Sequence, residues 1–497
     1  MDIANQVEYK GFFINGKWEN EFSKNNQFTP ISPAFNDLIL PTVYFSTSPV
    51  DKMVNFAHAA QKTWRTTTLE KRINLLLKVK ENLFSNSKTI AKTISIEMGK
   101  PYSESLVEAG ALCAKIDITI NEALKLVKTS YLELSPTNKG EIHYKPKGVL
   151  VVIGPFNFPV HLSNGQIIPA LLTGNTCILK PSEKSPLSAQ LYIEAFEQAG
   201  LPPGVIQLAQ GDHRVATDLI THPLTDGCLA TCSYDVGCKI QEKLAHNPEK
   251  IICLEMGGKN GCIVWDNPNT DLLADDLIRS CYLTTGQRCT ALSRVYIKRK
   301  LLPEVLEAFH QKSKNLLIHQ PFHEEPKPFM GPIVSKSAME NFFKYSDRAK
   351  LDDCENIMRP KQLSGEVPFS KSPLPNGYYV TPSINYIKKW NSESSYQSSE
   401  IFGPDVFFCP IDSIEEGVSA INSSKYGLSF SLYTKEEKDF DTVADQIEAG
   451  LLYWNRPTVG ASGKLPFGGW KRSGNHRPAG LFSIYGTIQV QARFKSL

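Results

Sequence analysis

Residues 250–294 read KIICLEMGGKNGCIVWDNPNTDLLADDLIRSCYLTTGQRCTALSR. Within them, Ile251–Leu254 is an apolar run typical of a strand in a parallel sheet, and it leads directly into Glu255. The pair Gly257-Gly258 follows, and two glycines allow the backbone to turn or to approach a ligand closely. We therefore expect the Glu255 carboxylate at the mouth of a buried strand.

A helix is predicted to follow this strand, with a thiol beyond its end. Apolar residues recur at three- and four-residue spacings from Thr270 to Cys281, and the pattern stops at Thr284-Thr285-Gly286. Positive charge or oriented N–H groups lower a thiol pKa, so Arg288 and the glycine-bounded turn make Cys289 a candidate nucleophile. The alternative is an inert buried cysteine, which is the commoner kind.

The composition fits a large soluble protein. The chain has 497 residues, of which 41% are hydrophobic and 21% are charged, so we expect two or three domains. Its 54 Lys and Arg residues against 51 Asp and Glu residues give a net charge of +3. So small an excess gives no reason to expect nucleic acid or an anionic membrane as a partner. A small-molecule ligand is the better expectation.

The cysteines and the N-terminus bear on the cellular location. The 11 cysteines are scattered without Cys-x-x-Cys spacing, which favours reduced thiols over disulfides. Met1–Asn5 lacks the basic start of a secretion signal, and no apolar run is long enough to cross a bilayer. We therefore expect a cytoplasmic protein. Cys228, Cys232 and Cys238 have no neighbouring histidines, so we interpret them as packing residues and predict no metal site.

Short apolar runs alternate with helical patterns five times between Val149 and Glu255. This rhythm predicts right-handed crossovers and a parallel sheet covered by helices on both faces. Open sheets of this kind bind ligands at the carboxyl ends of their strands, where Asn157, Lys180, Ser233 and Glu255 follow. The five runs are Val149–Ile153, Thr176–Leu179, Val205–Leu208, Gly227–Thr231 and Ile251–Leu254.

The flanking segments predict further elements. Asn15-Gly16 between apolar residues predicts a hairpin, a helical pattern covers Val50–Val127, and a helix begins at Pro186 with Ser185 as its N-cap. After Cys289 a second α/β domain is expected. Its strands are Arg294–Ile297, Gly377–Ile384 and Val406–Pro410, with a helix over Ser335–Asp352 and a loop or irregular insertion over Glu355–Leu374.

A second hairpin is predicted where Tyr131–Leu134 and Glu141–Tyr144 flank the polar turn Pro136–Gly140. Its place between two domain-like segments favours an arm for a partner subunit. Thr487–Arg493 alternates as an edge strand does. Such a strand needs a partner, which another subunit could provide.

The sheet region contains no G-x-G-x-x-G, so a bound dinucleotide would need other groups to hold it. Lys180-Pro181-Ser182-Glu183 offers an ammonium and a carboxylate at a strand end. The carboxylate could accept ribose hydroxyls and would repel a 2′-phosphate, which favours NAD over NADP. The alternative for this segment is a solvated surface turn.

Six motifs, in order along nearly the whole chain, resemble those of the aldehyde dehydrogenase superfamily. The resemblance implies a Rossmann-like NAD-binding domain (residues 1–125 and 146–257), an α/β catalytic domain (258–465) and a β-hairpin oligomerisation arm (126–145 and 480–497). Members usually form homodimers or homotetramers. The motifs are Gly154–Pro159, Lys180–Glu183, Leu254–Gly258, Gly286–Cys289, Glu400–Pro404 and Pro466–Gly469.

The resemblance also implies roles for single residues. Cys289 would attack the aldehyde as a thiolate, with the oxyanion held by the Asn157 amide and the Cys289 backbone N–H. Glu255 would take a proton from the water that hydrolyses the thioester. The presence of Glu255 favours water over coenzyme A as the acyl acceptor. The residues implied to hold NAD are Lys180, Ser182, Glu183, Ser233, Gly237, Glu400 and Phe402.

One departure from the family pattern lies at the helix that faces the pyrophosphate. The family usually has Thr-Gly-Ser where this chain has Thr231-Cys232-Ser233. Ser233 can still cap that helix, whose N–H groups favour phosphate. Cys232 adds bulk where the backbone normally passes close to the cofactor. An alternative function is therefore a family member that binds a nucleotide or a partner without turnover.

Two stretches resemble the members that oxidise N-succinylglutamate 5-semialdehyde in arginine catabolism. Val160 and Ser163 depart from that pattern, which normally has Gly and Pro there. The carboxylates of such a substrate need cationic partners, for which Arg456 and Arg477 are candidates. Surface salt bridges are the alternative role of these arginines, and oxidation of glutamate semialdehyde is the alternative reaction. The stretches are Asn157–Gly165 and Ser473–Pro478.

Overall fold

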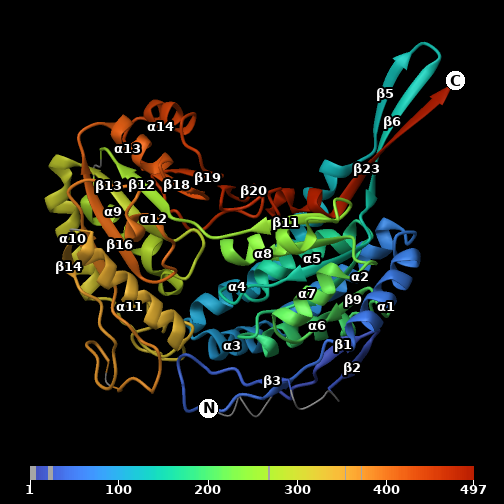
Figure 1. The fold of residues 1–497 in the computed structure, drawn as a ribbon, viewed down its shortest axis with the longest axis horizontal. Helices are drawn as coiled ribbons and strands as arrows, with labels where there is room; N and C mark the ends of the chain where they lie inside the picture. Colours follow the sequence, from blue (N-terminus) through green and yellow to red (C-terminus); the bar gives the residue numbers. More distant parts are fainter. Residues whose placement is uncertain (1–6, 21–25, 267–268, 353, 371, 497) are drawn as a thin grey trace.

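The computed structural model describes residues 7–20, 26–266, 269–352, 354–370 and 372–496. The stretch Met1–Asn5, which lacks the basic start of a secretion signal, lies outside these residues. Two seven-stranded sheets with flanking helices form the body of the molecule, and a three-stranded arm projects from it (Figure 1). The α/β class predicted from the sequence is confirmed.

The first sheet has the strand order β11-β10-β7-β8-β9-β1-β2, and its strands β7 to β11 are parallel. The predicted Asn-Gly hairpin is confirmed, because Asn15 and Gly16 form a turn with φ of 48° and 81°. All five predicted runs are strands. They are β7 (Val149–Ile153), β8 (Thr176–Lys180), β9 (Ile206–Leu208), β10 (Gly227–Thr231) and β11 (Ile251–Glu255), and the hairpin strands are β1 (Phe12–Ile14) and β2 (Lys17–Glu19).

Helices cover this sheet, and one begins in an unexpected way. Ser185 makes no side-chain cap at Pro186. Instead the buried Glu97 carboxylate accepts the backbone N–H groups of Leu187 (2.8 Å) and Ser188 (2.9 Å), and burial raises the pKa of Glu97 to about 7. The helices are α1 (Val50–Trp64), α2 (Leu69–Ser85), α3 (Ser87–Met98), α4 (Tyr102–Asn121), α5 (His161–Leu172), α6 (Pro186–Gln198), α7 (His213–Thr221) and α8 (Tyr234–Leu244).

The second sheet has the order β14-β15-β16-β13-β12-β18-β19. The sequence predicted β13, β15 and β16 but missed β12, β18 and β19, and the predicted strand from Gly377 begins only at Ser383. The predicted loop over Glu355–Leu374 opens with a strand, β14. The strands are β12 (Asn260–Val264), β13 (Leu292–Lys298), β14 (Glu355–Met358), β15 (Ser383–Tyr386), β16 (Asp405–Ile411), β18 (Ser429–Tyr433) and β19 (Leu451–Trp454).

Helices also flank the second sheet. The predicted helices from Thr270 and over Ser335–Asp352 are confirmed as α9 and α11, with Asn269 and Ser335 as their N-caps. The α-helices are α9 (Thr270–Tyr282), α10 (Leu302–Lys314), α11 (Lys336–Leu351), α12 (Ser395–Ser398), α13 (Ile414–Asn422) and α14 (Glu437–Ala444). Short strands complete the fold: β3 (Gln27–Phe28), β4 (Val43–Tyr44), β17 (Tyr426–Gly427), β20 (Pro466–Phe467), β21 (Trp470–Lys471) and β22 (Ala479–Gly480).

The arm consists of β5 (Ser130–Ser135), β6 (Asn138–Pro146) and β23 (Ile488–Ser496). The predicted hairpin is confirmed, but the expected partner of the C-terminal strand was wrong. β23 pairs antiparallel with β6 of the same chain, from Ile488 opposite Pro146 to Ser496 opposite Asn138. The arm therefore closes within one chain and keeps β5 and β23 as its edges (Figure 1).

Two features are absent from the described residues. No helix among them combines the length and the apolar character needed to cross a membrane. The same residues contain no group of three or more His, Cys, Asp or Glu side chains that could hold a metal ion.

Candidate active site

A cavity of about 790 Å³ lies at the carboxyl ends of the first sheet and reaches across to the second half of the molecule. Residues from β7, β8, β10 and β11 line one side, and residues from α11 and the segment after α12 line the other. A cavity of this size is in the range that holds a cofactor. The predicted site residues that line it are Asn157, Lys180, Ser182, Glu183, Ser233, Glu255, Cys289, Glu400 and Phe402.

Glu255 is the last residue of β11, as predicted, and it is 1% exposed. Its backbone is fixed because its carbonyl accepts the Cys232 N–H at 2.9 Å. Neither of its carboxylate oxygens has a hydrogen-bond partner among the described residues. Burial raises the pKa of Glu255 well above its ordinary value, and the positive charge of Arg477 opposes this shift only in part. An acid held in this way is suited to taking up a proton near neutral pH.

Cys289 follows a strained turn. Thr284, Thr285 and Gly286 all have positive φ, at 56°, 57° and 68°, a conformation that costs energy in non-glycine residues. A Cβ on Gly286 would lie 2.3 Å from the carbonyl oxygen of Gly403, so only glycine fits there. The Cys289 carbonyl accepts the Asn260 side-chain amide at 2.7 Å. The turn and this bond fix the direction of the thiol-bearing segment.

The expectation that Arg288 gives Cys289 a low pKa was wrong. Burial raises the pKa of the Cys289 thiol, and the carboxylates of Glu255 and Glu400 raise it further. Arg288 lowers it only slightly. The Arg288 guanidinium is engaged elsewhere, since its Nη2 lies 2.7 Å from Glu104 Oε2. The thiol is therefore neutral in this structure, and it must lose its proton before it can attack.

Asn157 lies in the loop after β7, and the structure ties it to the thiol-bearing segment. Its side-chain amide donates to the Gln287 carbonyl at 3.0 Å, two residues before Cys289. An amide has two N–H groups, so one remains for a ligand. The Asn157 backbone carbonyl accepts Lys100 Nζ at 3.1 Å. The predicted oxyanion donor and the predicted nucleophile thus line the same cavity.

Lys180 and Glu183 line the cavity where β8 ends. Lys180 Nζ is 2.9 Å from Glu183 Oε1 and donates to the Pro181 carbonyl at 2.8 Å. The Lys180 side chain is 4% exposed and that of Glu183 is 42% exposed. Glu183 is therefore open to a ligand, while Lys180 holds one of its carboxylate oxygens.

The N-terminus of α8 also opens into the cavity. Ser233 caps this helix, because its Oγ accepts the Val236 N–H at 3.4 Å, and Cys232 lines the cavity beside it. Burial raises the pKa of Cys232 to about 12, so this thiol is neutral too. Gly237 does not line the cavity. A Cβ there would lie 2.4 Å from Met256 Sδ, so this glycine allows α8 to pack closely on the residue after Glu255.

Glu400 and Phe402 border the part of the cavity that contains Cys289. Glu400 Oε1 accepts the Gly258 N–H at 3.0 Å, and burial raises the pKa of Glu400 to about 7. A Cβ on Gly257 would lie 1.9 Å from Glu400 Oε2, so this approach requires glycine. Phe402 packs edge-on against Phe156, with ring centroids 5.7 Å apart.

The two arginines proposed for substrate lie outside the cavity lining. Arg477 donates to the Gly469 carbonyl at 2.8 Å and acts electrostatically on Glu255. Arg456 is exposed, and its backbone carbonyl accepts Ser431 Oγ at 2.6 Å. Burial raises the pKa of Tyr453, and the positive charge of Arg456 opposes this shift in part.

The order and placement of these residues match a known family over almost the whole chain. A sequence model of the aldehyde dehydrogenase family matches residues 18–492. The chain belongs to the aldehyde dehydrogenase family. Its oxidoreductase chemistry follows from that membership, and the cavity that contains Cys289, Asn157 and Glu255 is the candidate active site of an aldehyde dehydrogenase.

Similar aldehyde dehydrogenases include two N-succinylglutamate 5-semialdehyde dehydrogenases. The one from Novosphingobium aromaticivorans is 33% identical over 87% of this chain and 89% of its own length. The one from Caulobacter sp. is 33% identical over 95% of this chain and 94% of its own. Among solved structures, 1-pyrroline-5-carboxylate dehydrogenase from Thermus with bound NAD is 26% identical, with a TM-score of 0.90 over 100% of this chain and 94% of that one.

A second solved relative is indole-3-acetaldehyde dehydrogenase in complex with NAD+. It is 26% identical, with a TM-score of 0.90 over 99% of this chain and 98% of that one. The aldehyde dehydrogenase fold predicted from the sequence motifs is thus confirmed. The proposed domain boundaries, at residues 125, 145, 257 and 465, remain predictions.

Proposed function

We propose that this enzyme oxidises an aldehyde to a carboxylate with NAD, through a thioester on Cys289. The observation that carries the proposal is that one cavity contains the thiol of Cys289, the amide of Asn157 and the carboxylate of Glu255. A nucleophile, an oxyanion donor and a general base are the three groups that this reaction needs from the protein.

The residues of the cavity suit NAD. Glu183 and Lys180 offer a carboxylate and an ammonium to the adenosine ribose, and a carboxylate there repels a 2′-phosphate. The N-terminus of α8 at Ser233 favours the pyrophosphate. Glu400 has one oxygen on Gly258 and a second for the other ribose. When bound, NAD supplies the acceptor for the hydride.

The remaining steps belong to the chain's own residues. Cys289 gives up its proton to solvent, and its sulfur bonds to the aldehyde carbon. The Asn157 amide and the Cys289 N–H hold the resulting oxyanion. Once that carbon has lost hydride, a thioester remains. Glu255 then takes a proton from the attacking water, and the C–S bond breaks to release the carboxylate.

Asn157→Ala is expected to lower kcat by about 100-fold to 1,000-fold, because an oxyanion donor is worth roughly 3 to 4 kcal/mol. The NAD dissociation constant should stay within about threefold, since NAD is assigned to other residues. Steady-state kinetics and calorimetric titration with NAD measure the two quantities. A loss of less than tenfold in kcat would remove Asn157 from the mechanism.

For the substrate we propose N-succinylglutamate 5-semialdehyde, an aldehyde with three carboxyl or amide groups to recognise. The names of the two 33% identical relatives support this choice. The test is NADH formation with a panel of aldehydes. We expect kcat/KM for this substrate to exceed that for glutamate 5-semialdehyde, because only the former offers the succinyl carboxylate. The reverse order would favour the glutamate semialdehyde reaction.

Arg456→Ala provides a second, matched measurement. We expect KM for the succinylated substrate to rise by about tenfold to a hundredfold, the value of a hydrogen bond to a charged group, while turnover of propanal stays unchanged. Arg299→Ala is the control, since Arg299 is an exposed arginine at the other end of β13 from Cys289, in an ion pair with Asp412.

The arm supports the proposal that the enzyme forms homodimers or homotetramers. The whole of β5 is exposed, including Tyr131, Leu132 and Leu134, and Val490 and Phe494 of β23 are exposed as well. An unpaired strand edge with apolar side chains is suited to pairing with another chain.

We place the enzyme in the cytoplasm, where its 11 free cysteines would stay reduced.

A further inference from the structure

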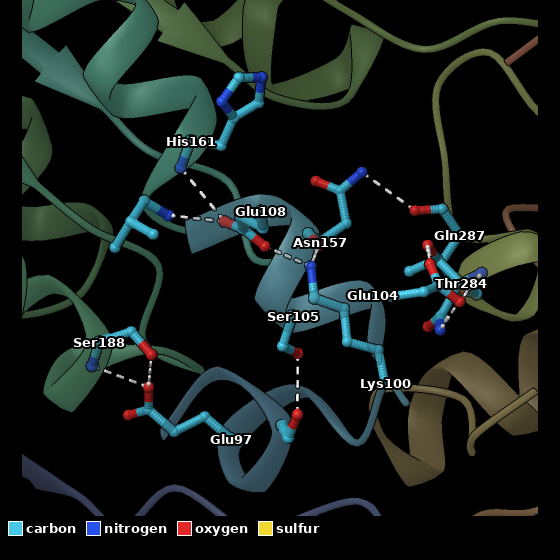
Figure 2. A network of polar contacts seen from close by, with 12 residues as sticks. Glu97, Lys100, Glu104, Ser105, Glu108, Asn157, His161, Ser188, Thr284 and Gln287 are labelled. Carbon is cyan, nitrogen blue, oxygen red and sulfur yellow. Dashed lines mark hydrogen bonds and ion pairs between the residues drawn. The ribbon is translucent and has the colours of Figure 1, made fainter. Parts of the chain in front are cut away.

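Two carboxylates lie one helical turn apart on α4, and each contacts a different loop of the candidate active site (Figure 2). They are Glu104 and Glu108, which share a face because residues four apart are neighbours on a helix. Glu108 is fully buried and the Glu104 side chain is 12% exposed. Neither residue lines the cavity, so neither touches a ligand there directly.

Glu104 holds the strained turn before Cys289. Its Oε1 accepts the Thr284 backbone N–H at 3.0 Å, and its Oε2 accepts the Thr284 hydroxyl at 2.5 Å. The same Oε2 lies 2.7 Å from Arg288 Nη2, directly beside the thiol-bearing residue. One carboxylate therefore stabilises the left-handed residues and fixes the arginine that precedes Cys289.

Glu108 holds the loop that carries Asn157. Its Oε1 accepts the backbone N–H groups of Val160 and His161, each at 3.2 Å. Its Oε2 forms a buried ion pair with Lys100, which in turn donates to the Asn157 carbonyl at 3.1 Å. Figure 2 shows this chain of contacts running from α4 to Asn157.

The ring of Phe158 contacts both cations that pair with these glutamates. Lys100 Nζ lies 4.2 Å from its centroid and the Arg288 guanidinium carbon lies 5.1 Å from it, both within the range of cation–π attraction. Each cation is paired with its own glutamate on α4. The loop after β7 and the segment before Cys289 are thus fixed to the same helical turn from both sides.

We infer that Glu104 and Glu108 are positioning residues, which set the distance between the Cys289 sulfur and the Asn157 amide. The inference rests on the proposed function. An oxyanion donor works only at about 2.7–3.1 Å from the developing charge, and a displacement of about 1 Å can cost on the order of 100-fold in rate. The single bond from Asn157 to Gln287 does not fix two loops by itself.

The test uses the full-length enzyme and an activated ester, 4-nitrophenyl acetate, without NAD. The Cys289 sulfur bonds to the ester carbonyl carbon, the oxyanion forms, and its collapse breaks the C–O bond and releases 4-nitrophenolate, which is measured by absorbance. The acetyl thioester is then hydrolysed by water. This assay depends on the thiol and the oxyanion site but not on the aldehyde or the cofactor.

Glu104→Ala is expected to slow 4-nitrophenolate release by about 100-fold with KM changed less than about threefold, and Glu104→Gln, which keeps an acceptor for Thr284, should lose less. Because removing one partner of a buried ion pair can unfold a protein, Glu108 is tested as Lys100→Met/Glu108→Leu, which leaves no charge unpaired. That variant should show a similar loss. NAD binding and the thermal unfolding midpoint are measured on each variant.

Glu97→Gln is the matched control, because Glu97 is also buried and also accepts two backbone N–H groups, but those of α6. Figure 2 shows its contact with Ser188. It should keep the wild-type release rate. In the Asn157→Ala background the effect of Glu104→Ala should shrink to less than about fivefold, since coupled residues are not additive. Full additivity, or a rate within threefold of wild type in folded Glu104→Ala, would overturn the inference.

The same assay distinguishes a failure of the proposed function from a failure of the positioning role. If wild type and Cys289→Ala release 4-nitrophenolate equally, then Cys289 is not the nucleophile and the proposed function is lost. If wild type is active, Cys289→Ala is inactive and the Glu104 variants are unaffected, only the positioning role is lost.

Discussion

Cys289→Ala is expected to form NADH from any aldehyde at a rate lower by on the order of 10⁴-fold or more, the scale of losing a catalytic nucleophile. The other thiol of the cavity, Cys232, cannot replace it. Cys232 lies at the α8 end of the cavity, where the cofactor is assigned. NAD binding by the variant should match that of wild type.

The control for this prediction is Cys113→Ala, which removes a partly exposed cysteine on α4. Peptide mass spectrometry after iodoacetamide treatment of the wild-type enzyme should show Cys289 modified. Residual activity of Cys289→Ala within tenfold of wild type would contradict the thioester route. An unmodified Cys289, with no NADH formed, would favour a family member that binds nucleotide without turnover.

Glu255→Gln is expected to lower steady-state turnover by about 10³-fold, within the range for a lost general base, while leaving the first turnover detectable. Without the base, the thioester on Cys289 is hydrolysed slowly and accumulates. Rapid mixing should then show up to one equivalent of NADH per site, and intact-protein mass spectrometry should show the acyl group. A variant that turns over normally would assign the base elsewhere.

The structure predicts in which direction kcat should change with pH. Burial raises the pKa of Glu255, so its basic form is lost as the pH falls, and kcat should decline on the acid side at a pH well above the ordinary glutamate value. The carboxylates of Glu255 and Glu400 also raise the pKa of Cys289, which acts in the same direction. In Glu255→Gln the limb of the profile that belongs to Glu255 should disappear.

The sequence was sufficient to place a candidate site residue where a polar residue directly follows a buried apolar strand or a glycine turn. Glu255 after an apolar strand and Cys289 after a glycine turn could both be placed, because strand ends of a parallel sheet meet at one edge. The charge state of Cys289 could not be read in the same way. Arg288 is adjacent to Cys289 in sequence. Its guanidinium, however, forms an ion pair with Glu104, 184 residues earlier in the chain.

Contacts between residues far apart in the sequence account for the other differences between the predicted and the observed structure. Glu104 and Glu108 on α4 look like a solvated helix face, because nothing local shows that Lys100 and two loops will cover them. β12 was missed because it follows a glycine pair and itself contains Asn260 and Gly261, which are poor strand formers. The partner of β23 is β6, more than 340 residues away in sequence. An alternating pattern predicts a strand but does not identify the strand with which it pairs.

The contact between Gly286 and Gly403 has a consequence for engineering. The backbone before the thiol touches the backbone that follows Glu400 and Phe402, with no room for even a methyl group between them. A redesign of residues 400–404 for another nucleotide would therefore shift the sulfur as well. Libraries aimed at cofactor preference in this protein should be screened for acyl transfer at the same time, because the two properties share one backbone contact.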